Sequence, residues 1–516
     1  MAEPGGRLLV VGTAKPDYVE RFLARPEAAG AALLAARRDR ERFAGRAGRA
    51  FYFSGTLRWF TPALLAAFAA VRPDRVVIVC GLAFDHANVV EAARIASSLL
   101  GRPADVRVAV DRAVLPPPPL PGRGPAWLEI LRLFPLAALA GLVWLARPWR
   151  TVRVGAIYAH RLGHLALDCE IYLCERDLGE VPPRCLDIFY PESGRVANAP
   201  LLAMFGRCMR IHPAGRWLRE AVDLFGLGAR HEAVMATHRM PFARDAACLM
   251  QRVPAHLRLT EAERRRGEAG RRALGLPPGV PHVCLLGRDD RYLRAVSGEH
   301  GDGGHQWPRN MDIAAFGPAA LALAERGYAV VRMGSLVAEP FAVDHPLVFD
   351  YASHPARDPF LDIFLAATCR FFVGAPSGLL HVPMVFRIPC LSVNLARVGL
   401  MHACDPRDMT IFKLLRLRRE NRLLTLSEIL ATGRAVRRIE EAAADADVDY
   451  LDNTPEDIRD AALEMHERLD GTWRDAPGDA ALQERFRRLF PPDAYNRCRR
   501  SPVGTAFLRR HRDLLR

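Results

Sequence analysis

The sequence predicts an α/β protein made of several units in which buried strands alternate with helices. Three observations lead to this prediction. The chain has 516 residues, too many for one ordinary core, which indicates two or three domains. Half of the residues are hydrophobic and a quarter are charged, the balance of a globular chain. Apolar runs of strand length recur in both halves of the chain with helical stretches between them, as in parallel sheets.

The composition limits the partners that we expect. The net charge is +14, but only Lys15 and Lys413 among the 72 basic residues are lysines, and no basic block is interleaved with aromatics. Such a diffuse excess is weak evidence for nucleic-acid binding, so we expect no nucleic-acid partner. The eleven cysteines include no Cys-x-x-Cys pair, and several, such as Cys80, Cys284 and Cys390, lie in apolar runs. We therefore expect buried reduced thiols, no disulfide framework and a cytoplasmic location.

Residues 1–112 are predicted to form a small Rossmann-like domain. The dinucleotide fingerprint is missing, because the turn after the first strand contains only Gly12, so no NAD is predicted. The run Leu8–Gly12 is also too short for the apolar core of a signal peptide. The expected elements are strands at Leu8–Val11, Phe51–Phe53 and Val76–Val79, and helices at Pro62–Val71 and Asn88–Leu100.

Residues 113–150 are predicted to contain a stiff linker around Pro116–Pro119 and then an apolar segment. Leu133–Ala146 is 14 residues long without a charge, and Trp127 and Trp144 accompany it as aromatics do at membrane surfaces. Pro135 argues against a straight helix. Three interpretations stay open: a segment that dips into one leaflet, a buried helix between domains, and a transmembrane span. We expect peripheral membrane contact through about residues 127–150.

Two α/β lobes and a helical end are predicted beyond residue 150. The domain boundaries are expected at residues 151–275 for the first lobe, 276–430 for the second and 431–516 for a carboxy-terminal helical segment. Ligands of open α/β sheets bind at the carboxyl ends of the strands, so we expect site residues in the loops that follow strands. The expected elements are strands at Val152–Tyr158, Val283–Leu286, Tyr328–Met333, Leu347–Tyr351, Phe371–Val373 and Cys390–Val393, and helices at Asp312–Arg326, Pro359–Ala367, Ser377–Phe386 and from Pro455.

The loop after Leu286 places Arg288, Asp289 and Tyr292 at a strand end. An arginine there can bind the leaving phosphates of a nucleoside diphosphate in a bidentate manner, and a surface salt-bridge loop is the alternative. The glycine-rich segment that follows contributes three further candidates for the same pocket, or is an ordinary loop. These candidates are His305, Arg309 and Asn310.

The strongest local signal is the run from Phe371 to Leu379, an apolar strand that enters a small-residue turn. Gly374 ends the strand, and Ser377 and Gly378 are predicted to begin a helix. The free amides and positive dipole end of such a helix favour a phosphate. The hydroxyl of Ser377 is suited to cap the helix, to bind the phosphate, or to do both.

Arg161, Gly163 and His164 form a turn between a strand and a helix in the first lobe. His164 is a candidate general base for an acceptor hydroxyl, with Asp289 or Asp290 as equal rivals and a structural histidine as the alternative. No metal site is expected. The pair at Asp445 and Asp447 fits a solvated face, and His-Glu-x-x-His, Gly-x-Ser-x-Gly and P-loop motifs are missing.

An ordered set of short motifs extends over residues 151–470, and it resembles a family of bacterial glycosyltransferases. The resemblance implies the two-lobed GT-B fold and a distant similarity to fucosyltransferases, whose strand-end arginine engages the donor diphosphate; Arg288 matches that position. The fucosyltransferase pattern has adjacent arginines where this chain has Gly287-Arg288-Asp289, so GDP-fucose is not implied. The motifs are Arg161–Leu165, Val196–Asn198, Arg288-Asp289 with Tyr292, Arg309-Asn310, Arg326–Gly334, Asp350-Tyr351, Phe360–Phe364, Phe372–Gly374, Ser377–Leu379, Val393-Asn394, Ile411–Lys413 and Leu424–Ile429.

The sequence thus predicts a GT-B-like glycosyltransferase, preceded by a small α/β domain and an apolar segment. It would transfer sugar from a nucleotide sugar to a glycan or lipid-linked acceptor in cell-envelope polysaccharide synthesis, at the inner face of the plasma membrane. The nucleotide sugar is a co-substrate, and no cofactor or metal is expected, as the resemblance implies. Two alternatives stay open: a sugar-nucleotide-modifying enzyme such as an epimerase, and a non-catalytic membrane-attached protein that binds nucleotide sugar.

Overall fold

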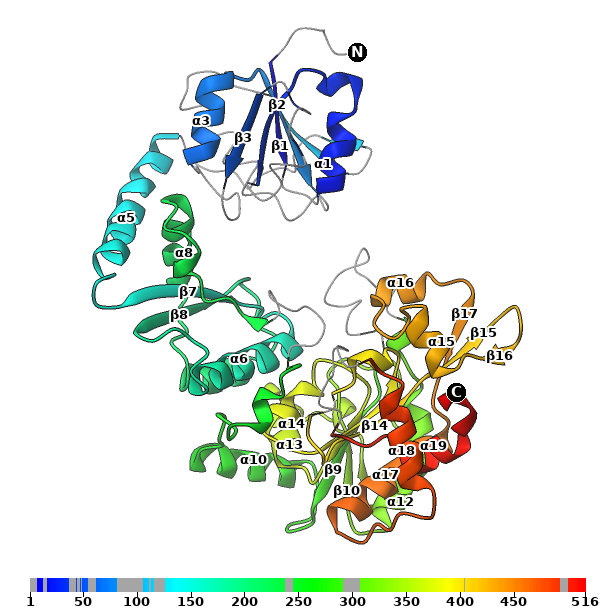
Figure 1. Ribbon diagram of the computed structural model, residues 1–516. Helices are drawn as coiled ribbons and strands as arrows, with labels where there is room; N and C mark the ends of the chain where they lie inside the picture. The colour runs from blue at the N-terminus through cyan, green and yellow to red at the C-terminus, as the bar shows by residue number, and fades with distance from the viewer. Residues whose placement is uncertain are drawn as a thin grey trace. The chain divides into compact units, whose positions relative to one another are not determined.

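The structure is a computed structural model that describes residues 7–12, 16–36, 43, 47, 49–53, 62–80, 105–110, 113–115, 126–236, 245–289, 291, 307–402, 404–491 and 500–516. The chain forms two compact units (Figure 1). The amino-terminal unit comprises Met1–Ala156, Pro183–Tyr190 and Ile211–Ala233, and the carboxy-terminal unit comprises Ile157–Pro182, Pro191–Arg210 and Val234–Arg516. Each unit contains a six-stranded, largely parallel sheet, so the predicted α/β class is confirmed. The predicted domain boundaries stay predictions.

The amino-terminal sheet has the strand order β3-β2-β1-β4-β5-β6, in which only the pair β5–β6 is antiparallel. Helices α1 (Pro16–Leu23) and α3 (Pro62–Val71) flank the sheet (Figure 1). The three predicted strands and the helix at Pro62–Val71 are confirmed, and the helix predicted at Asn88–Leu100 lies outside the described residues. The strands are β1 Leu8–Gly12, β2 Ala32–Ala36, β3 Arg49–Phe53, β4 Arg75–Cys80, β5 Asp105–Val110 and β6 Ala113–Leu115.

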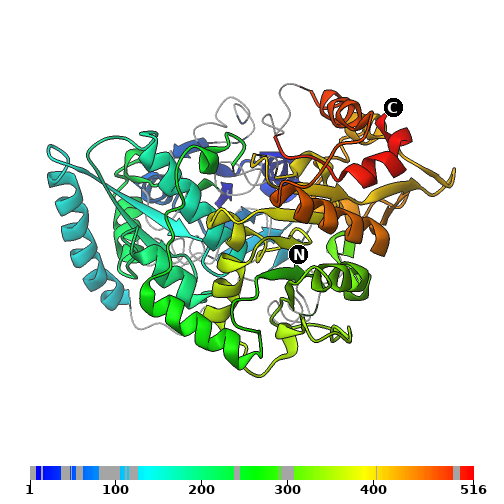
Figure 2. The ribbon, with the colours of Figure 1, turned by 90° about the horizontal axis from the view of Figure 1, so that it is seen from below.

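The same unit also contains α5 (Ala126–Leu145), which continues through Pro135 (cyan in Figure 2). It packs against α8 (Gly215–Leu224), near the two-stranded sheet of β7 (Thr151–Ile157) and β8 (Cys185–Pro191). The stretch predicted as the first lobe therefore contributes two strands. Among the described residues, we find no helix with both the length and the apolar character needed to cross a membrane.

The carboxy-terminal sheet has the order β11-β10-β9-β12-β13-β14, and all of its pairs are parallel. Numbered along the chain from β9, this is the 3-2-1-4-5-6 order of a Rossmann sheet. The five strands predicted in this region are present, as β9 His282–Leu286, β10 Ala329–Arg332, β11 Val348–Phe349, β12 Phe372–Gly374 and β13 Cys390–Leu395. The sixth strand, β14 Met409–Phe412, was not predicted. A small antiparallel sheet of β15 Leu414–Leu417, β16 Arg422–Leu423 and β17 Val448–Leu451 follows.

The helices of this unit surround the sheet and include a capping box of Thr454 with Asp457, next to Pro455 at the first position, as the sequence predicts. The described helices are α6 Leu162–Asp177, α7 Ala199–Gly206, α10 Glu261–Ala273, α12 Gly317–Ala324, α13 Pro359–Thr368, α14 His381–Val385, α15 Leu426–Ala431, α16 Ile439–Ala443, α17 Pro455–Leu469, α18 Asp479–Arg488 and α19 Thr505–Arg510.

Two expectations are wrong. The helix predicted at Ser377–Phe386 begins only at His381. Pro383 has no amide hydrogen to donate and lies in the first turn of α14, where this costs least; a start at Ser377 would place it in the helix interior, which is unfavourable. The expectation of reduced thiols is also wrong for one pair, since Cys248 is bonded to Cys404. Their separation of 156 residues along the chain gives no sequence signal. Cys284 and Cys390 are buried and free, as predicted.

Gly267 allows α10 to pack closely on α13. An added Cβ there would collide with the ring of Phe364. Gly267→Ala should lower the free energy of unfolding by about 1–3 kcal/mol through overpacking. Gly206→Ala is the matched control, because a Cβ at this helical position meets nothing within 4 Å. Urea denaturation of both variants tests this, and equal stabilities would contradict the close packing.

Candidate functional site

The candidate site lies where the carboxy-terminal sheet reverses its strand order. The neighbours β9 and β12 are the first and fourth strands of the sheet along the chain. The connections that follow them leave in opposite directions, and open α/β sheets bind ligands at such a switch point. Gly287–Asp289 follows β9, and Ala375–Gly378 follows β12. Gly374 closes β12 opposite Leu286, and a Cβ at Gly374 would lie 3.1 Å from the Leu286 Cβ.

Hydrogen bonds connect the loops that the sequence singles out. The amide of Met311 donates to the carbonyl of Arg288 at 3.0 Å. The guanidinium of Arg309 donates to the carbonyl of Pro376 at 2.5 Å. The structure thus brings Arg288, Arg309 and the segment at Ser377 together at the switch point. Their roles in binding stay predictions.

Lys413 is a buried residue that contacts the segment of Arg309 and Asn310, and the sequence analysis did not select it as a site residue. Its ammonium donates to the carbonyl of Asn310 at 3.1 Å and to the Asp452 carboxylate at 2.5 Å. Burial lowers the pKa of Lys413 in spite of Asp452. Two signals were available: its rarity, since the chain has only two lysines, and its place in the motif Ile411–Lys413. Lys413 positions the backbone of Asn310 beside the site.

The amino terminus of α6 contacts the loop after β12, within the carboxy-terminal unit. A Cβ at Gly163 would lie 2.7 Å from Nδ1 of His381 and 3.0 Å from the Cα of Gly378. A Cβ at Gly378 would lie 3.1 Å from the amide nitrogen of Gly163. The two segments can approach this closely because Gly163 and Gly378 have no side chains. The turn predicted to bind the acceptor and the turn predicted to bind the phosphate are therefore in contact.

His164 lies in the first turn of α6, next to the two glycines. Its Nδ1 is 3.5 Å from Oδ2 of Asp168, one helical turn later. The Asp168 side chain is fully buried, whereas that of His164 is 21% exposed. The ring centroids of His164 and Tyr158 are 5.4 Å apart. A partly exposed imidazole held by a buried carboxylate has the arrangement of a general base and its orienting group.

Sequence reasoning missed Asp168, although its spacing of four residues from His164 on a helix was a usable signal. It also missed His381, whose ring centroid lies 5.3 Å from that of His402. His381 follows the switch-point strand β12 and adds an imidazole beside Gly163.

The remaining predicted residues have different positions. Both carboxylate oxygens of Asp289 accept backbone amides, from Arg291 at 3.0 Å and from Ala338 at 2.9 Å, which favours a role in holding the loop. Arg161 is exposed at the N-cap of α6 and makes no side-chain cap there. Tyr292 and His305 lie outside the described residues.

Ser377 does not cap a helix, which corrects the sequence interpretation. The N-cap of α14 is Leu380, and α14 has five residues. The Ser377 hydroxyl oxygen is buried and has no hydrogen-bond partner within the described part of the chain. Buried hydroxyls rarely stay unsatisfied, so this oxygen is available to a ligand at the switch point.

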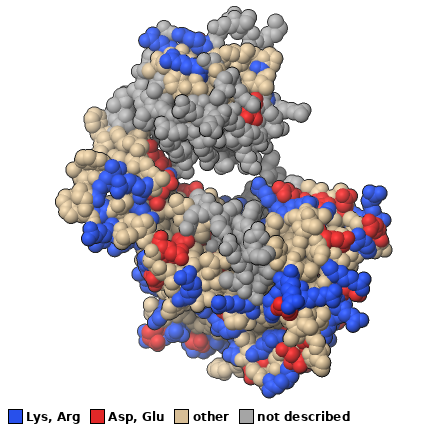
Figure 3. All heavy atoms as spheres, in the orientation of Figure 1, with Lys and Arg blue, Asp and Glu red and all other residues tan. Residues whose placement is uncertain are grey.

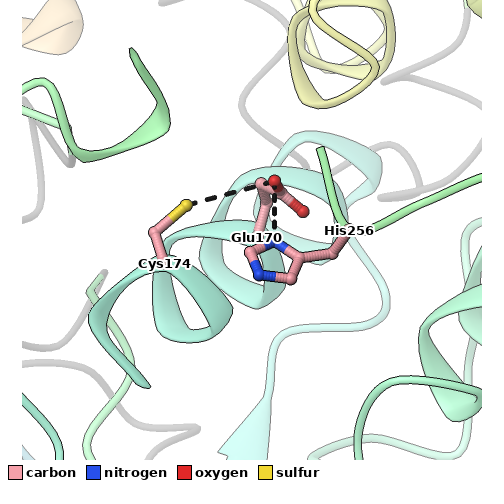
Figure 4. Close-up of side chains that lie close together, drawn as sticks. All are labelled: Glu170, Cys174 and His256. Carbon is pink, nitrogen blue, oxygen red and sulfur yellow. Dashed lines mark hydrogen bonds and ion pairs between the residues drawn. The ribbon is translucent and has the colours of Figure 1, made fainter. Parts of the chain in front are cut away.

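A second polar cluster consists of Glu170 and Cys174 on α6 and of His256 in the segment before α10 (Figure 4). Their ligand atoms lie within 4.8 Å of one another, a spacing that suits a metal ion. The guanidinium of Arg387, however, donates at 2.6 Å to the same Glu170 oxygen that faces His256 at 3.0 Å. A bound cation would meet this guanidinium at close range, so an ion-pair network describes the cluster better.

The electrostatics of the cluster follow from its burial. Burial raises the pKa of the Cys174 thiol to about 12, and the Glu170 carboxylate adds to the shift. Burial opposes the charged form of His256, but hydrogen bonds to Glu170 and Asp177 outweigh it and raise the pKa of this imidazole. A protonated His256 and Arg387 thus both neutralise the fully buried Glu170.

Arg387→Met should lower the free energy of unfolding by about 3 kcal/mol, because it leaves a buried carboxylate without its main partner. The double variant Arg387→Met/Glu170→Gln should recover more than half of this loss. Denaturant titration at pH 7 measures both. A single variant as stable as the double one would contradict the network.

Comparisons with known proteins identify no family. No protein-family model matches the sequence, and the search of curated proteins finds no match. Similar solved structures include the ADP-heptose lps heptosyltransferase II of E. coli, with 13% identity and a TM-score of 0.33 over 51% of this chain and 90% of that one. A glycosyl transferase family 9 protein of Veillonella parvula has 10% identity and a TM-score of 0.23 over 79% and 85%. A UDP-GlcNAc 2-epimerase of Methanocaldococcus jannaschii has 9% identity and a TM-score of 0.19 over 79% and 89%. At these scores the similarity does not identify the reaction.

Proposed function

We propose that this protein is a glycosyltransferase that moves a sugar from a nucleotide-sugar donor to a glycan or lipid-linked acceptor in cell-envelope polysaccharide synthesis. The observation that carries the proposal is the contact between two kinds of group at the switch point. Arg288, Arg309 and the Ser377 hydroxyl supply phosphate-binding chemistry. The pair of His164 and Asp168 lies on the same helix as Gly163, which contacts Gly378 in the loop after β12.

In this proposal the donor diphosphate binds beside Arg288, which stabilises the charge that develops on the leaving phosphate. His164 accepts the proton of the acceptor hydroxyl as the glycosidic bond forms at the anomeric carbon, and the nucleoside diphosphate departs. Arginine supplies the positive charge in this scheme, so the reaction needs no metal at this position.

A thermal-shift panel on the full chain with ADP, GDP, UDP, dTDP and CMP tests donor binding. One nucleotide should stabilise the protein selectively, by about 2.7 kcal/mol at 100 times its dissociation constant. A labelled donor with that base, incubated with and without membrane-extracted acceptors, then tests transfer. Conversion of the donor without any acceptor would favour an epimerase instead, and binding without turnover would favour a non-catalytic protein.

A further inference from the structure

Residues 134–145 of helix α5, the part whose side chains the structure describes, present an uncharged, exposed face to solvent. Phe134, Leu142 and Leu145 are 68%, 64% and 56% exposed, and Trp144 is 57% exposed. The other exposed positions described on the helix, Pro135, Ala137 and Ala138, are apolar as well. Helices on the surface of a globular protein normally carry polar residues on the face that is turned to water. An apolar face in this position is typical of a surface that binds a membrane or another protein.

The opposite face of α5 is already used in packing. Leu136, Ala140 and Val143 are buried, and Val143 belongs to a hydrophobic cluster with Leu218 and Val222 of α8. The exposed face is therefore separate from the face that packs against α8. α5 has two apolar faces, and packing through the buried one fixes the position of the helix.

Polar contacts fix the carboxyl end of α5 as well. The guanidinium of Arg147 donates to His231 at 3.0 Å and to the carbonyl of Leu227 at 3.2 Å. The imidazole of His231 is fully buried and faces the carbonyl of Val152 at 2.6 Å. Arg147 therefore fixes the turn after α5, which contains Trp149, to the segment around Leu227 and His231.

Exposed tryptophans and arginines also occur next to α5 in the chain and on α8, the helix that packs against it. Trp149 in the turn after α5 is 74% exposed, and Trp217 on α8 is 63% exposed. Arg150 follows Trp149 and Arg216 precedes Trp217, and both arginines are exposed. Lys and Arg atoms adjoin uncharged surface around α5 in Figure 3. Indole rings favour the headgroup level of a bilayer, and guanidinium groups attract anionic lipids.

We propose that the apolar face of α5 docks on the surface of an anionic phospholipid bilayer, together with Trp149 and Arg150 in the turn after it and Trp217 and Arg216 on α8. The helix would lie in the plane of the interface, with its apolar side chains among the acyl chains and the arginines at the phosphates. This proposal does not depend on the proposed transfer reaction.

Co-sedimentation of the full chain with vesicles tests this proposal. The wild type should bind vesicles of phosphatidylcholine with about 30% phosphatidylglycerol at low salt, and more weakly in about 0.5 M NaCl. Phe134→Gln/Leu145→Gln/Trp149→Gln should lower the partition coefficient roughly tenfold for each apolar side chain lost. Arg150→Gln/Arg216→Gln should lower it roughly fivefold for each arginine on the anionic vesicles, with no change on pure phosphatidylcholine.

Leu321→Gln on α12 is the control, since Leu321 is 39% exposed in the carboxy-terminal unit, and it should bind as the wild type does. Circular dichroism checks folding, and the arginine variant decides the matter if the apolar variant does not fold. No binding of the wild type to anionic vesicles would overturn the proposal. So would an apolar variant that binds normally, or one whose only change is a smaller assembly in light scattering, which would make the face an interface between copies of this chain.

Discussion

Arg288→Ala should lower kcat/KM for sugar transfer by about 10²–10³-fold, the effect of removing one preorganised group that stabilises transition-state charge. Arg288 follows the first strand of the sheet, directly at the switch point, and its carbonyl is fixed by the amide of Met311. The loop backbone should therefore keep its position in the variant, so that the loss reports on the guanidinium. Steady-state kinetics with the nucleotide sugar selected by the thermal-shift panel measures it.

Arg291→Ala is the matched control for this experiment. Arg291 is an exposed arginine in the same loop, and the contact that we describe for it is a backbone amide to Asp289, which alanine retains. Its kcat/KM should stay within a factor of about three, as expected when an exposed charge contributes little. Equal losses in both variants would mean that the loop as a whole matters, and an unchanged Arg288→Ala enzyme would remove this arginine from the mechanism.

The two variants also separate donor binding from catalysis. If Arg288 contacts the diphosphate in the ground state as well as in the transition state, the nucleotide-dependent thermal shift should shrink in Arg288→Ala along with kcat/KM. A normal shift with a low kcat would place its effect in the transition state alone. A lost shift with a normal kcat at saturating donor would make Arg288 a binding residue only.

The strands of the carboxy-terminal sheet were predictable because each is a short apolar run bounded by a loop. The predicted strand Val283–Leu286 falls inside β9, and the predicted strand Phe371–Val373 is shifted by one residue from β12. The rule that ligands bind where strands end then selected loops that the structure indeed places side by side, at Arg288 and at Ser377. The strand order, which defines the switch point, was not visible in the sequence itself.

The parts that could not be predicted depend on contacts between distant segments or on competition between local rules. The Arg387–Glu170 ion pair joins residues 217 positions apart, and no periodic pattern encodes it. The start of α14 was misplaced because a small-residue turn suggested an N-cap at Ser377, whereas Pro383 limits how early that helix can begin. The close approach of Gly163 to Gly378 is likewise a tertiary contact, and each glycine alone suggests only a turn.

His164→Ala should lower kcat by about 10²–10⁴-fold, the usual contribution of a positioned general base, while the nucleotide-dependent thermal shift stays unchanged. Added imidazole should restore part of the rate, which a purely structural histidine would not allow. Asp168→Asn should lower kcat without a matching change in KM, because the amide no longer holds the imidazole in one orientation. His160→Ala is the matched control, since His160 lies in the loop just before α6 with its ring centroid 5.6 Å from that of Tyr158.

These variants also decide between His164 and Asp289 as the base. The Asp289 carboxylate already accepts the amides of Arg291 and Ala338, so Asp289→Asn should mainly lower stability, by about 1 kcal/mol, and leave kcat within a few-fold of the wild type. The opposite pattern, an active His164→Ala enzyme and an inactive Asp289→Asn enzyme, would transfer the base to the loop after β9. In that case the buried Asp168 would serve to hold the first turn of α6 against Gly378, and the acceptor would have to approach from the Asp289 side of the switch point.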